Sequence, residues 1–296
     1  MIGMSFPCPR LGGNQGGPTF TGILDQLGTA AVGAWSMRRL TNTYEGDACT
    51  LIRASDSTTL AVGFDAQGNF DAATAATFLT ATTGKGTVWN DQSGNGNDGS
   101  QSTDASRPAY TASAINSLPM WDFLGGVNAP RFNAANSASL QNLFASGGTL
   151  VVVMAMETTA DRIVTKGDTN GWGLVRNGGN PAFYCAFDTS SANARTNGSE
   201  FSTNAAALLV VTYNGGTSGD NTFFYKNGSA TTRLTISSGT GSQKSDAASG
   251  LAIGARFTTG ANPFVGKIAE VMLFPAVLSS EDRATLTADI VAYYGL

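Results

Sequence analysis

Apolar residues dominate two long stretches in the second half of the chain, residues 149–156 and 207–213. A continuous apolar run of this length is typical of a strand that is covered on both faces. Shorter strand-like segments lie at residues 222–226, 232–236 and 251–253, and Asn-Gly pairs begin at residues 170, 177, 197, 214 and 227. Because Asn-Gly favours tight turns between antiparallel strands, this half of the chain predicts an antiparallel β-sandwich.

A few segments carry helical signals instead. Residues 30–40 predict a short helix, and Asp71 can cap a second helix over the residues that follow it. Near the end of the chain, Ser279 and Asp282 have the spacing of a capping box, and Gly295 supplies a stop. The residues between them form one apolar stripe of Leu286, Ile290 and Tyr294. We expect this last helix to pack on the sandwich.

Residues 1–24 are rich in glycine and proline and lack hydrophobic periodicity. Such a segment cannot offset its own ordering entropy, so it gains order only on another surface. We predict an extended N-terminal docking arm, with Phe6, Leu11 and Phe20 as its anchors, that binds a neighbouring chain. Residues 25–296 are predicted to form a single domain, because β-sandwiches often reach about 200 to 250 residues as one unit. Its elaborated first part covers residues 25–110, and its main sandwich and C-terminal helix cover residues 119–296.

Composition narrows the classes of function. Only 13% of the residues are charged, and the net charge is -4, so there is no basic surface that would indicate a nucleic-acid partner. Three widely spaced cysteines favour a chain that folds in a reducing compartment. The N-terminus lacks the pattern of a signal peptide, and no stretch approaches the roughly 18 apolar residues of a membrane span. We therefore expect no membrane partner and no export by the ordinary secretory route.

The absence of histidine excludes whole classes of chemistry. A Ser-His-Asp triad, a Cys-His pair and the His-containing zinc sites all need an imidazole. The chain also lacks a phosphate-binding loop, and its glycine-rich segment at residues 12–17 does not follow a strand. We expect no cofactor and no metal, and any catalysis would have to be carried by carboxylates.

Residues 89–98 read WNDQSGNGND and predict a fixed corner of the backbone. Asn95-Gly96 supplies the left-handed angles of a tight turn, and the side chains of Asp91 and Asp98 can bind neighbouring amides. The alternative is a calcium loop, because Asp91, Ser93 and Asn95 match the first half of an EF-type loop. Position 12 of that loop is Ser102 instead of the usual Glu, so we favour the structural corner.

Two further positions are candidate site residues. Trp172 lies between turn glycines that would leave its ring uncovered, so Trp172 and Asn170 are predicted to form a carbohydrate-binding platform. Trp35, Trp89 and Trp121 are predicted to pack in the core. Glu270 shares a strand face with apolar residues and could act as an acid with a raised pKa. We favour the alternative that it accepts hydrogen bonds from arginine or the backbone.

Both ends of the chain resemble known families. Residues 34–40 (AWSMRRL) and 91–97 (DQSGNGN) are the clearest parts of a stretch, about residues 25–110, that resembles the arabinofuranosidase-B catalytic module. The same stretch resembles more closely the relatives of that module among bacteriophage and prophage structural proteins. Residues 264–274 and 278–282 resemble the closing strand and helix of laminin-G-like jelly rolls. The resemblance implies an all-β, concanavalin A-like antiparallel β-sandwich, or jelly roll, with a few short helices and the N-terminal arm.

The same resemblance guides the expectation about function. The arabinofuranosidase family has an acid in a Gly-Gly-Asp string before the closing strand, where this chain has Ala255 and Arg256, and its adjacent cysteine pair is not matched at Cys185. Retaining glycosidases need two carboxylates about 5 to 5.5 Å apart. We therefore expect a chain that is not an enzyme.

By this resemblance the protein is a structural component of a bacteriophage virion, made in the host cytoplasm: a head-decoration, head-fibre or tail-associated subunit. Its expected partners are other virion proteins, copies of itself in a homo-oligomer and a host cell-surface glycan. The alternatives are an arabinofuranosidase-type glycoside hydrolase and a lectin-like carbohydrate-binding module. Fold alone does not decide among these functions.

Overall fold

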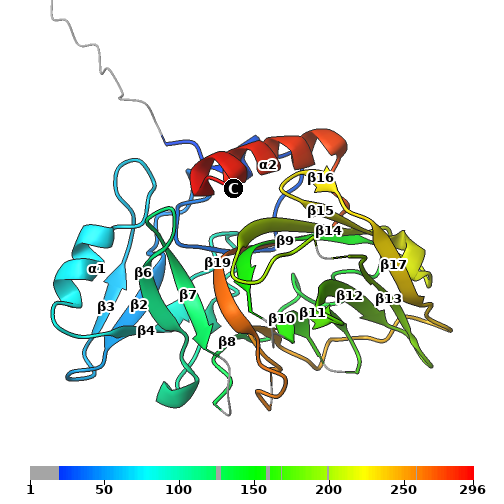
Figure 1. The fold of residues 1–296 in the computed structure, drawn as a ribbon, viewed down its shortest axis with the longest axis horizontal. Helices are drawn as coiled ribbons and strands as arrows, with labels where there is room; N and C mark the ends of the chain where they lie inside the picture. The colour runs from blue at the N-terminus through cyan, green and yellow to red at the C-terminus, as the bar shows by residue number, and fades with distance from the viewer. Residues whose placement is uncertain (1–19, 125–127, 158–160, 168, 199, 258) are drawn as a thin grey trace, which may run out of the picture.

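The computed structural model describes residues 20–296, except residues 125–127, 158–160, 168, 199 and 258. Two β-sheets pack face to face, and the helix α2 (Ser280–Tyr294) lies across the outer face of the upper one (Figure 1). All strand pairs that the structure describes between named strands are antiparallel. The predicted antiparallel β-sandwich with a few short helices is therefore confirmed.

The upper sheet is built around β19 (Val265–Phe274). One edge of β19 pairs with β9 (Gly148–Met156), and the sheet continues through β14 (Ala206–Tyr213), β15 (Thr222–Lys226) and β16 (Ser229–Ala230). The other edge pairs with β7 (Leu118–Leu124) along its first half and with β1 (Gly33–Ser36) along its second half. These bounds match the strands predicted from the long apolar runs.

The lower sheet contains seven strands in the described part of the chain. Their order is β17 (Arg233–Ser237), β13 (Ser191–Thr196), β12 (Asn180–Ala186), β11 (Trp172–Asn177), β10 (Arg162–Lys166), β18 (Leu251–Ile253) and β8 (Phe132–Ala134). Strand β8 also pairs with the short β5 (Gly99–Ser100), which links this sheet to the first part of the domain.

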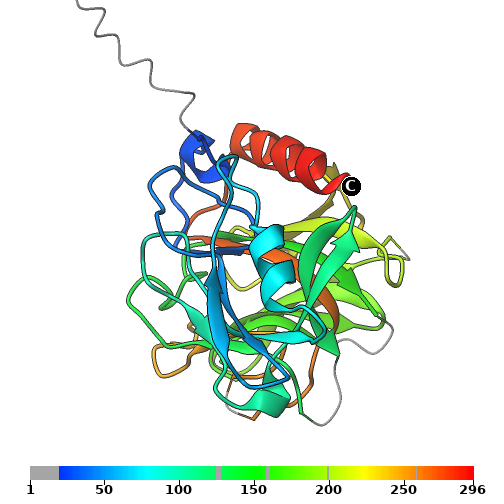
Figure 2. The same cartoon turned by 90° about the vertical axis from the view of Figure 1, so that its left-hand side faces the viewer.

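The first part of the domain adds a smaller layer beside the sandwich. It contains β2 (Cys49–Arg53), β3 (Thr59–Val62), β4 (Gly84–Trp89), β6 (Ala109–Ile115) and α1 (Ala72–Phe78), with 3-10 turns at Ile23–Gln26 and Asp104–Ser106. A third 3-10 turn, Gly219–Asn221, precedes β15. The turned view shows α1 on the flank of this layer and α2 above the sandwich (Figure 2). Strand β6 pairs with β7 and thereby joins the layer to the upper sheet.

Two apolar cores explain the sequence pattern. One lies between the sheets and contains Trp35, Trp89 and Trp121, which are fully buried as predicted. The other lies between the upper sheet and α2 and contains the apolar stripe of that helix, Leu286, Ile290 and Tyr294. Strands β9 and β14 face both cores, which is why both faces of these strands are apolar.

The helix termini follow their predicted signals. The Ser279 hydroxyl accepts a hydrogen bond from the backbone N–H of Asp282 at 3.0 Å, and Gly295 ends α2 with a left-handed φ of 65°. The Asp71 carboxylate accepts a hydrogen bond from the backbone N–H of Thr74 at 3.0 Å and begins α1. Both predicted caps are confirmed.

The helix predicted over residues 30–40 is wrong. This segment contains β1, whose backbone pairs with the second half of β19. Its side chains alternate between the cores, because Trp35 points between the sheets and Ala34 points toward α2. Pairing with β19, which is far away in the sequence, overrides the local helical pattern here.

Candidate functional site

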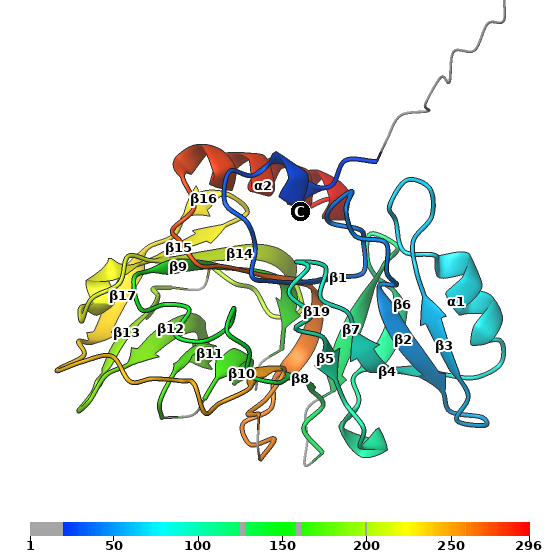
Figure 3. The same cartoon turned by 180° about the vertical axis from the view of Figure 1, so that it is seen from behind.

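The two sheets differ in what covers their outer faces. Helix α2 covers the upper sheet, whereas strands β10 to β13 carry no helix on their outer side in the described part of the chain (Figure 3). In the lower sheet, Phe183 and Cys185 on β12 belong to the inner core, so Tyr184 between them faces outward. The outer face of the lower sheet, which we call the open face, therefore carries no helix in the described residues; Thr165 and Ala182 on it are buried, whereas Tyr184 is partly exposed.

Strand register places the outward residues in two transverse rows. One row runs across β10 to β13 and consists of Thr165, Gly173, Tyr184 and Asn193. The parallel row consists of Arg162, Val175, Ala182 and Arg195. We call these eight residues the Tyr184 face.

Tyr184 lies against the backbone of the neighbouring strand. A Cβ atom added at Gly173 would stand 2.7 Å from Cε1 of Tyr184, so only glycine leaves room for the ring there. Arg162 Nη1 donates a hydrogen bond to the Tyr184 hydroxyl at 2.6 Å, and the guanidinium carbon lies 5.5 Å from the ring centroid. The ring is thus held by a hydrogen bond and a cation–π contact.

Amide and guanidinium groups at the borders of this face have unused hydrogen-bonding capacity. Within the described ranges, the buried Oδ1 atoms of Asn193 and Asn133 and the buried Nε atom of Arg195 have no hydrogen-bond partner. Asn133 continues the Tyr184 row, because it is aligned with Ala252 on β18, which is aligned with Thr165. A buried polar atom without a partner is costly, and a bound ligand or water can satisfy it.

One carboxylate lies beside the Tyr184 face. Asp161 Oδ1 is 3.9 Å from Nε of Arg162. Burial raises the pKa of Asp161 above its ordinary value, and the charges of Arg162 and Arg256 offset part of this rise. The loop after β18 brings Arg256 near, because the carbonyl of Ala255 accepts a hydrogen bond from the Thr165 hydroxyl at 3.2 Å. The Asp161 side chain is 41% exposed, so this carboxyl group is accessible from solvent.

The predicted platform at Trp172 and Asn170 is not formed. Trp172 is fully buried and packs against Phe144, with ring centroids 4.7 Å apart. The glycines beside it serve close packing: a Cβ at Gly171 would overlap the carbonyl oxygen of Lys166, and Gly173 makes room for Tyr184. Asn170 is exposed in the preceding loop, where its Oδ1 is 3.1 Å from the Thr169 hydroxyl. The expectation of an exposed Trp172 ring is wrong.

The Asp91 corner is held by hydrogen bonds to the backbone. Asp91 accepts bonds from the N–H groups of Ala34 at 2.8 Å, Ser93 at 2.9 Å and Asn97 at 2.9 Å, and from the Ser93 hydroxyl at 2.8 Å. Asp98 accepts a bond from the N–H of Asp91 at 2.8 Å. The Asn95 amide reaches the Ser93 hydroxyl at 3.1 Å. These bonds fix the loop against β1, on the opposite side of the sandwich core from the Tyr184 face.

The arm anchors fall into two groups. Phe6 and Leu11 lie outside the described residues. Phe20 contacts its own chain, since the Arg39 guanidinium carbon is 5.1 Å from its ring centroid and a Cβ at Gly68 would overlap its ring. Phe20 therefore packs on the domain, whereas the sequence pattern assigned it to a neighbouring chain.

Glu270 lies in a separate polar cluster beneath α2. It is fully buried and accepts hydrogen bonds from the Ser36 hydroxyl at 2.7 Å, Arg38 Nε at 2.9 Å and the Tyr294 hydroxyl at 3.2 Å. Arg38 also pairs with Asp289 on α2 at 2.5 Å. The preferred interpretation, a Glu that accepts hydrogen bonds from arginine, is confirmed.

Nothing in the sequence indicated Tyr184 and Arg195 as site residues, because only the strand register shows which face they share.

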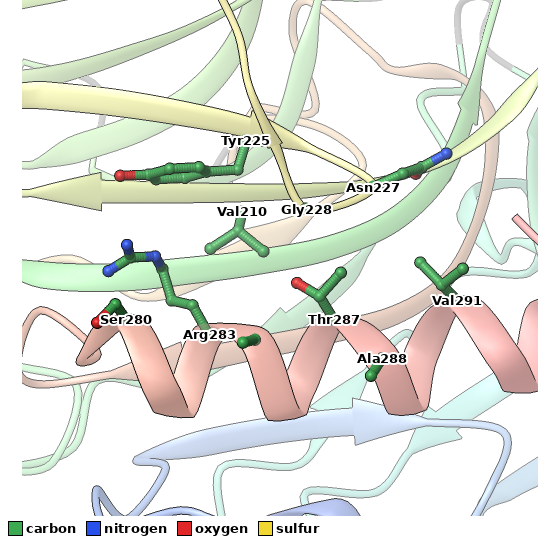
Figure 4. A pocket seen from close by; sticks show the side chains of 10 residues that line it. Val210, Tyr225, Asn227, Gly228, Ser280, Arg283, Thr287, Ala288 and Val291 are labelled. Carbon is green, nitrogen blue, oxygen red and sulfur yellow. The ribbon is translucent and has the colours of Figure 1, made fainter.

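A groove of about 360 Å³ separates α2 from the edge of the upper sheet (Figure 4). Two of the polar side chains that line it are already engaged within the protein. The Arg283 guanidinium lies over the Tyr225 ring at 4.6 Å and donates to the Leu278 carbonyl at 2.8 Å. The Asn227 side chain accepts the backbone N–H of Leu208 at 2.9 Å. The groups that would recognise a polar ligand are thus less available here than at the Tyr184 face.

Comparison with known proteins agrees with this architecture. Residues 136–282 match the family model described as the concanavalin A-like lectin/glucanases superfamily. An arabinofuranosidase complexed with arabinofuranosyl-alpha-1,2-xylobiose has a TM-score of 0.67 and 16% identity, with 92% of this chain and 64% of that chain covered. A mutant GH54 α-L-arabinofuranosidase soaked with 4-nitrophenyl α-L-arabinofuranoside has a TM-score of 0.66 and 16% identity, with the same coverage.

A more distant likeness extends beyond these enzymes. The binding domain of Paraclostridial Mosquitocidal Protein 1 has a TM-score of 0.51 and 14% identity, with 68% of this chain and 49% of that chain covered. No curated protein sequence matches the chain. The chain spans 64% of the length of the arabinofuranosidase structures, and at these identities the likeness shows the fold. The fold is a concanavalin A-like, laminin-G-like jelly roll, as the sequence resemblance implied.

These comparisons correct one expectation. The chain was expected not to be an enzyme, because Ala255 and Arg256 replace the acid of the arabinofuranosidase family. The structures that cover 92% of the chain are nevertheless glycoside hydrolases, so that exclusion is wrong. A change at one sequence position was a poor guide, because the same fold can carry its functional groups at other positions. Among the helices described, none is long and apolar enough to cross a membrane.

Proposed function

We propose that this protein binds carbohydrate on the Tyr184 face. The observation that carries the proposal is the combination of an outward aromatic ring with unsatisfied amide and guanidinium groups on the open sheet. A sugar ring presents C–H groups that pack on an aromatic face and hydroxyls that donate to amide oxygens. The jelly-roll fold supports this proposal, because the structures with the same fold include enzymes bound to arabinose-containing ligands.

Binding can be measured by titration calorimetry with a panel of oligosaccharides that includes arabinoxylan fragments. Tyr184→Ala should weaken binding about tenfold or more, because it removes the ring on which the sugar packs. Phe223→Ala is the matched control, since Phe223 is a partly exposed aromatic on β15 in the other sheet. If both variants bind like the unchanged protein, or if no oligosaccharide binds at all, the Tyr184 face is not a carbohydrate site.

A second candidate function is hydrolysis of a glycosidic bond. Asp161 favours it, because it is an accessible carboxyl group directly before β10, 3.9 Å from Arg162, and burial raises its pKa above the ordinary value. The same protein samples can be assayed for release of 4-nitrophenol from 4-nitrophenyl α-L-arabinofuranoside. Turnover that is lost in Asp161→Asn and retained in Asp188→Asn would support hydrolysis. Turnover that persists in Asp161→Asn would assign the acid to another residue.

We also propose a place of action, which follows from the sequence resemblance of residues 25–110. The protein would be a part of a bacteriophage particle in which the jelly roll presents its open face to a host glycan. The low share of charged residues supports a subunit that packs among neighbours. Antibody labelling of intact particles would detect the chain on the virion, and purified particles free of the chain would contradict this assignment.

A further inference from the structure

Arginines gather around the Tyr184 face, although the whole chain has a net charge of -4. Arg162 and Arg195 lie in the same transverse row, on β10 and β13. Arg131 directly precedes β8, and its Nη1 lies beside Gly260 in the loop after β18. Arg256 belongs to the same loop and acts on the pKa of Asp161. The face therefore has a local positive potential that the overall composition hides.

Two of these arginines donate hydrogen bonds to uncharged backbone carbonyl groups. Arg195 donates through Nη1 to the carbonyl of Asn177 at 3.2 Å, and Arg131 donates through Nη1 to the carbonyl of Ala129 at 3.1 Å. Over the residues described, neither forms an ion pair, and the Nε atoms of Arg131, Arg162 and Arg195 have no hydrogen-bond partner. Arg162 has Asp161 at 3.9 Å, a long contact for an ion pair. Positive charge on this face is thus only partly balanced by the protein.

The spacing of the arginines suits an elongated ligand. Arg162 and Arg195 are three strands apart, which corresponds to about 14 Å at the usual strand separation of about 4.8 Å. The floor between them is formed by Val175 and Ala182, and the Tyr184 ring lies in the adjoining row. A short saccharide laid across the strands can therefore pack on Tyr184 and place charged groups near both arginines.

We infer that the ligand of the Tyr184 face is an acidic oligosaccharide whose carboxylate groups are bound by Arg162 and Arg195. This inference rests on the proposed carbohydrate binding and specifies its ligand class. The planar guanidinium group matches a planar carboxylate with two parallel hydrogen bonds, and such charge-assisted bonds are about twice as strong as neutral ones. A neutral sugar would leave the arginine Nε groups and their charge without a counterpart.

The test compares trigalacturonic acid with its methyl ester, which has the same rings without the charges. Titration calorimetry with the full chain at low salt should show at least tenfold tighter binding of the acid, and this preference should shrink at 0.5 M salt. Arg195→Gln should lower the affinity for the acid about tenfold and lower the affinity for the ester much less, so the preference for the acid should shrink. Arg195→Lys, which keeps the charge, should lose less than Arg195→Gln. The control is Arg283→Gln on α2, which should bind both ligands normally, and circular dichroism verifies the fold of each variant.

The outcomes separate the two proposals. Equal affinity for the acid and the ester would overturn the charge inference while the carbohydrate proposal stands. No binding of either ligand, together with no binding in the oligosaccharide panel, would overturn the carbohydrate proposal itself. An effect of Arg283→Gln equal to that of Arg195→Gln would place acid binding outside the Tyr184 face and also overturn the inference.

Discussion

At the scale of single residues, the Glu270 carboxylate is tightly constrained by its buried surroundings. It has no solvent exposure and receives hydrogen bonds from β1, from Arg38 and from α2. Arg38 in turn contacts Asp289 and lies 4.6 Å from the Tyr293 ring centroid. One buried anion therefore connects the first strand of the domain to its last helix.

Glu270→Gln is expected to lower the free energy of unfolding by about 3 to 5 kcal/mol, because removing one partner leaves the Arg38 charge buried with weaker compensation. Equilibrium unfolding in urea measures this loss. Asp289→Asn is the matched comparison, since Asp289 contacts the same arginine but is partly exposed, and its loss should be about 1 kcal/mol or less. Equal losses for the two variants would contradict a central role for Glu270.

The residue types in the sequence predicted which side chains are buried. They did not predict which side chains form the candidate site. Trp35, Trp89 and Trp121 are core residues, as expected of large apolar side chains. Trp172 was misjudged because glycines next to it indicated a turn, whereas Gly173 makes room for the Tyr184 ring. Arg162 and Arg195 are 33 positions apart in the sequence and meet only through strand pairing. No local pattern could bring them together.

At the scale of elements, the sequence correctly predicted where helices begin and end. It did not correctly predict whether the short segment at residues 30–40 forms a helix or a strand. Ser279, Gly295 and Asp71 each act on the backbone of their own neighbourhood, so their effect can be predicted locally. Residues 30–40 form part of a strand because β19 supplies their hydrogen bonds from the far end of the chain. Local sequence contains no information about such a partner.

Helix α1 gives a prediction about pH. The hydrogen bond from the Thr74 hydroxyl, with that from the Thr74 backbone, lowers the pKa of Asp71 below its ordinary value. A carboxylate whose pKa is lowered by folding stabilises the fold above its unfolded pKa of about 3.9, and this contribution is lost as the pH falls through the folded value. Asp71→Asn should therefore lower the melting temperature at pH 7, and this difference should shrink as the pH falls below the unfolded pKa and through the lower folded pKa. Thermal melts across pH 2 to 7 would show it, and a difference that grows in acid would contradict it.

At the scale of the whole molecule, we expect the arm and the domain to make separable contributions. The domain carries its own cores, and Phe20, where the described residues begin, packs against it. Residues 2–18 combine prolines and glycines with few apolar side chains, a composition that gains little stability by itself.

Deleting residues 2–18 is expected to change the melting temperature of the isolated protein by no more than about 2 °C and, under the proposed virion role, to abolish incorporation into particles. Differential scanning calorimetry and particle purification measure the two effects. Phe20→Ala in the full chain is the complementary variant, which should lower the melting temperature and leave incorporation intact. Normal incorporation of the deleted protein would assign docking to the domain surface.

Strand β19 has a consequence for how the protein is made. It pairs with β1, β7 and β9, so the first strand and the long central strand share a partner that begins at Val265. A ribosome must therefore release almost the whole chain before β1 can pair with β19, and until then the edge of β9 that does not pair with β14 also stays unpaired. A truncated product that ends before β19 would be a target for proteolysis and aggregation, so during synthesis the sandwich is completed late and all at once.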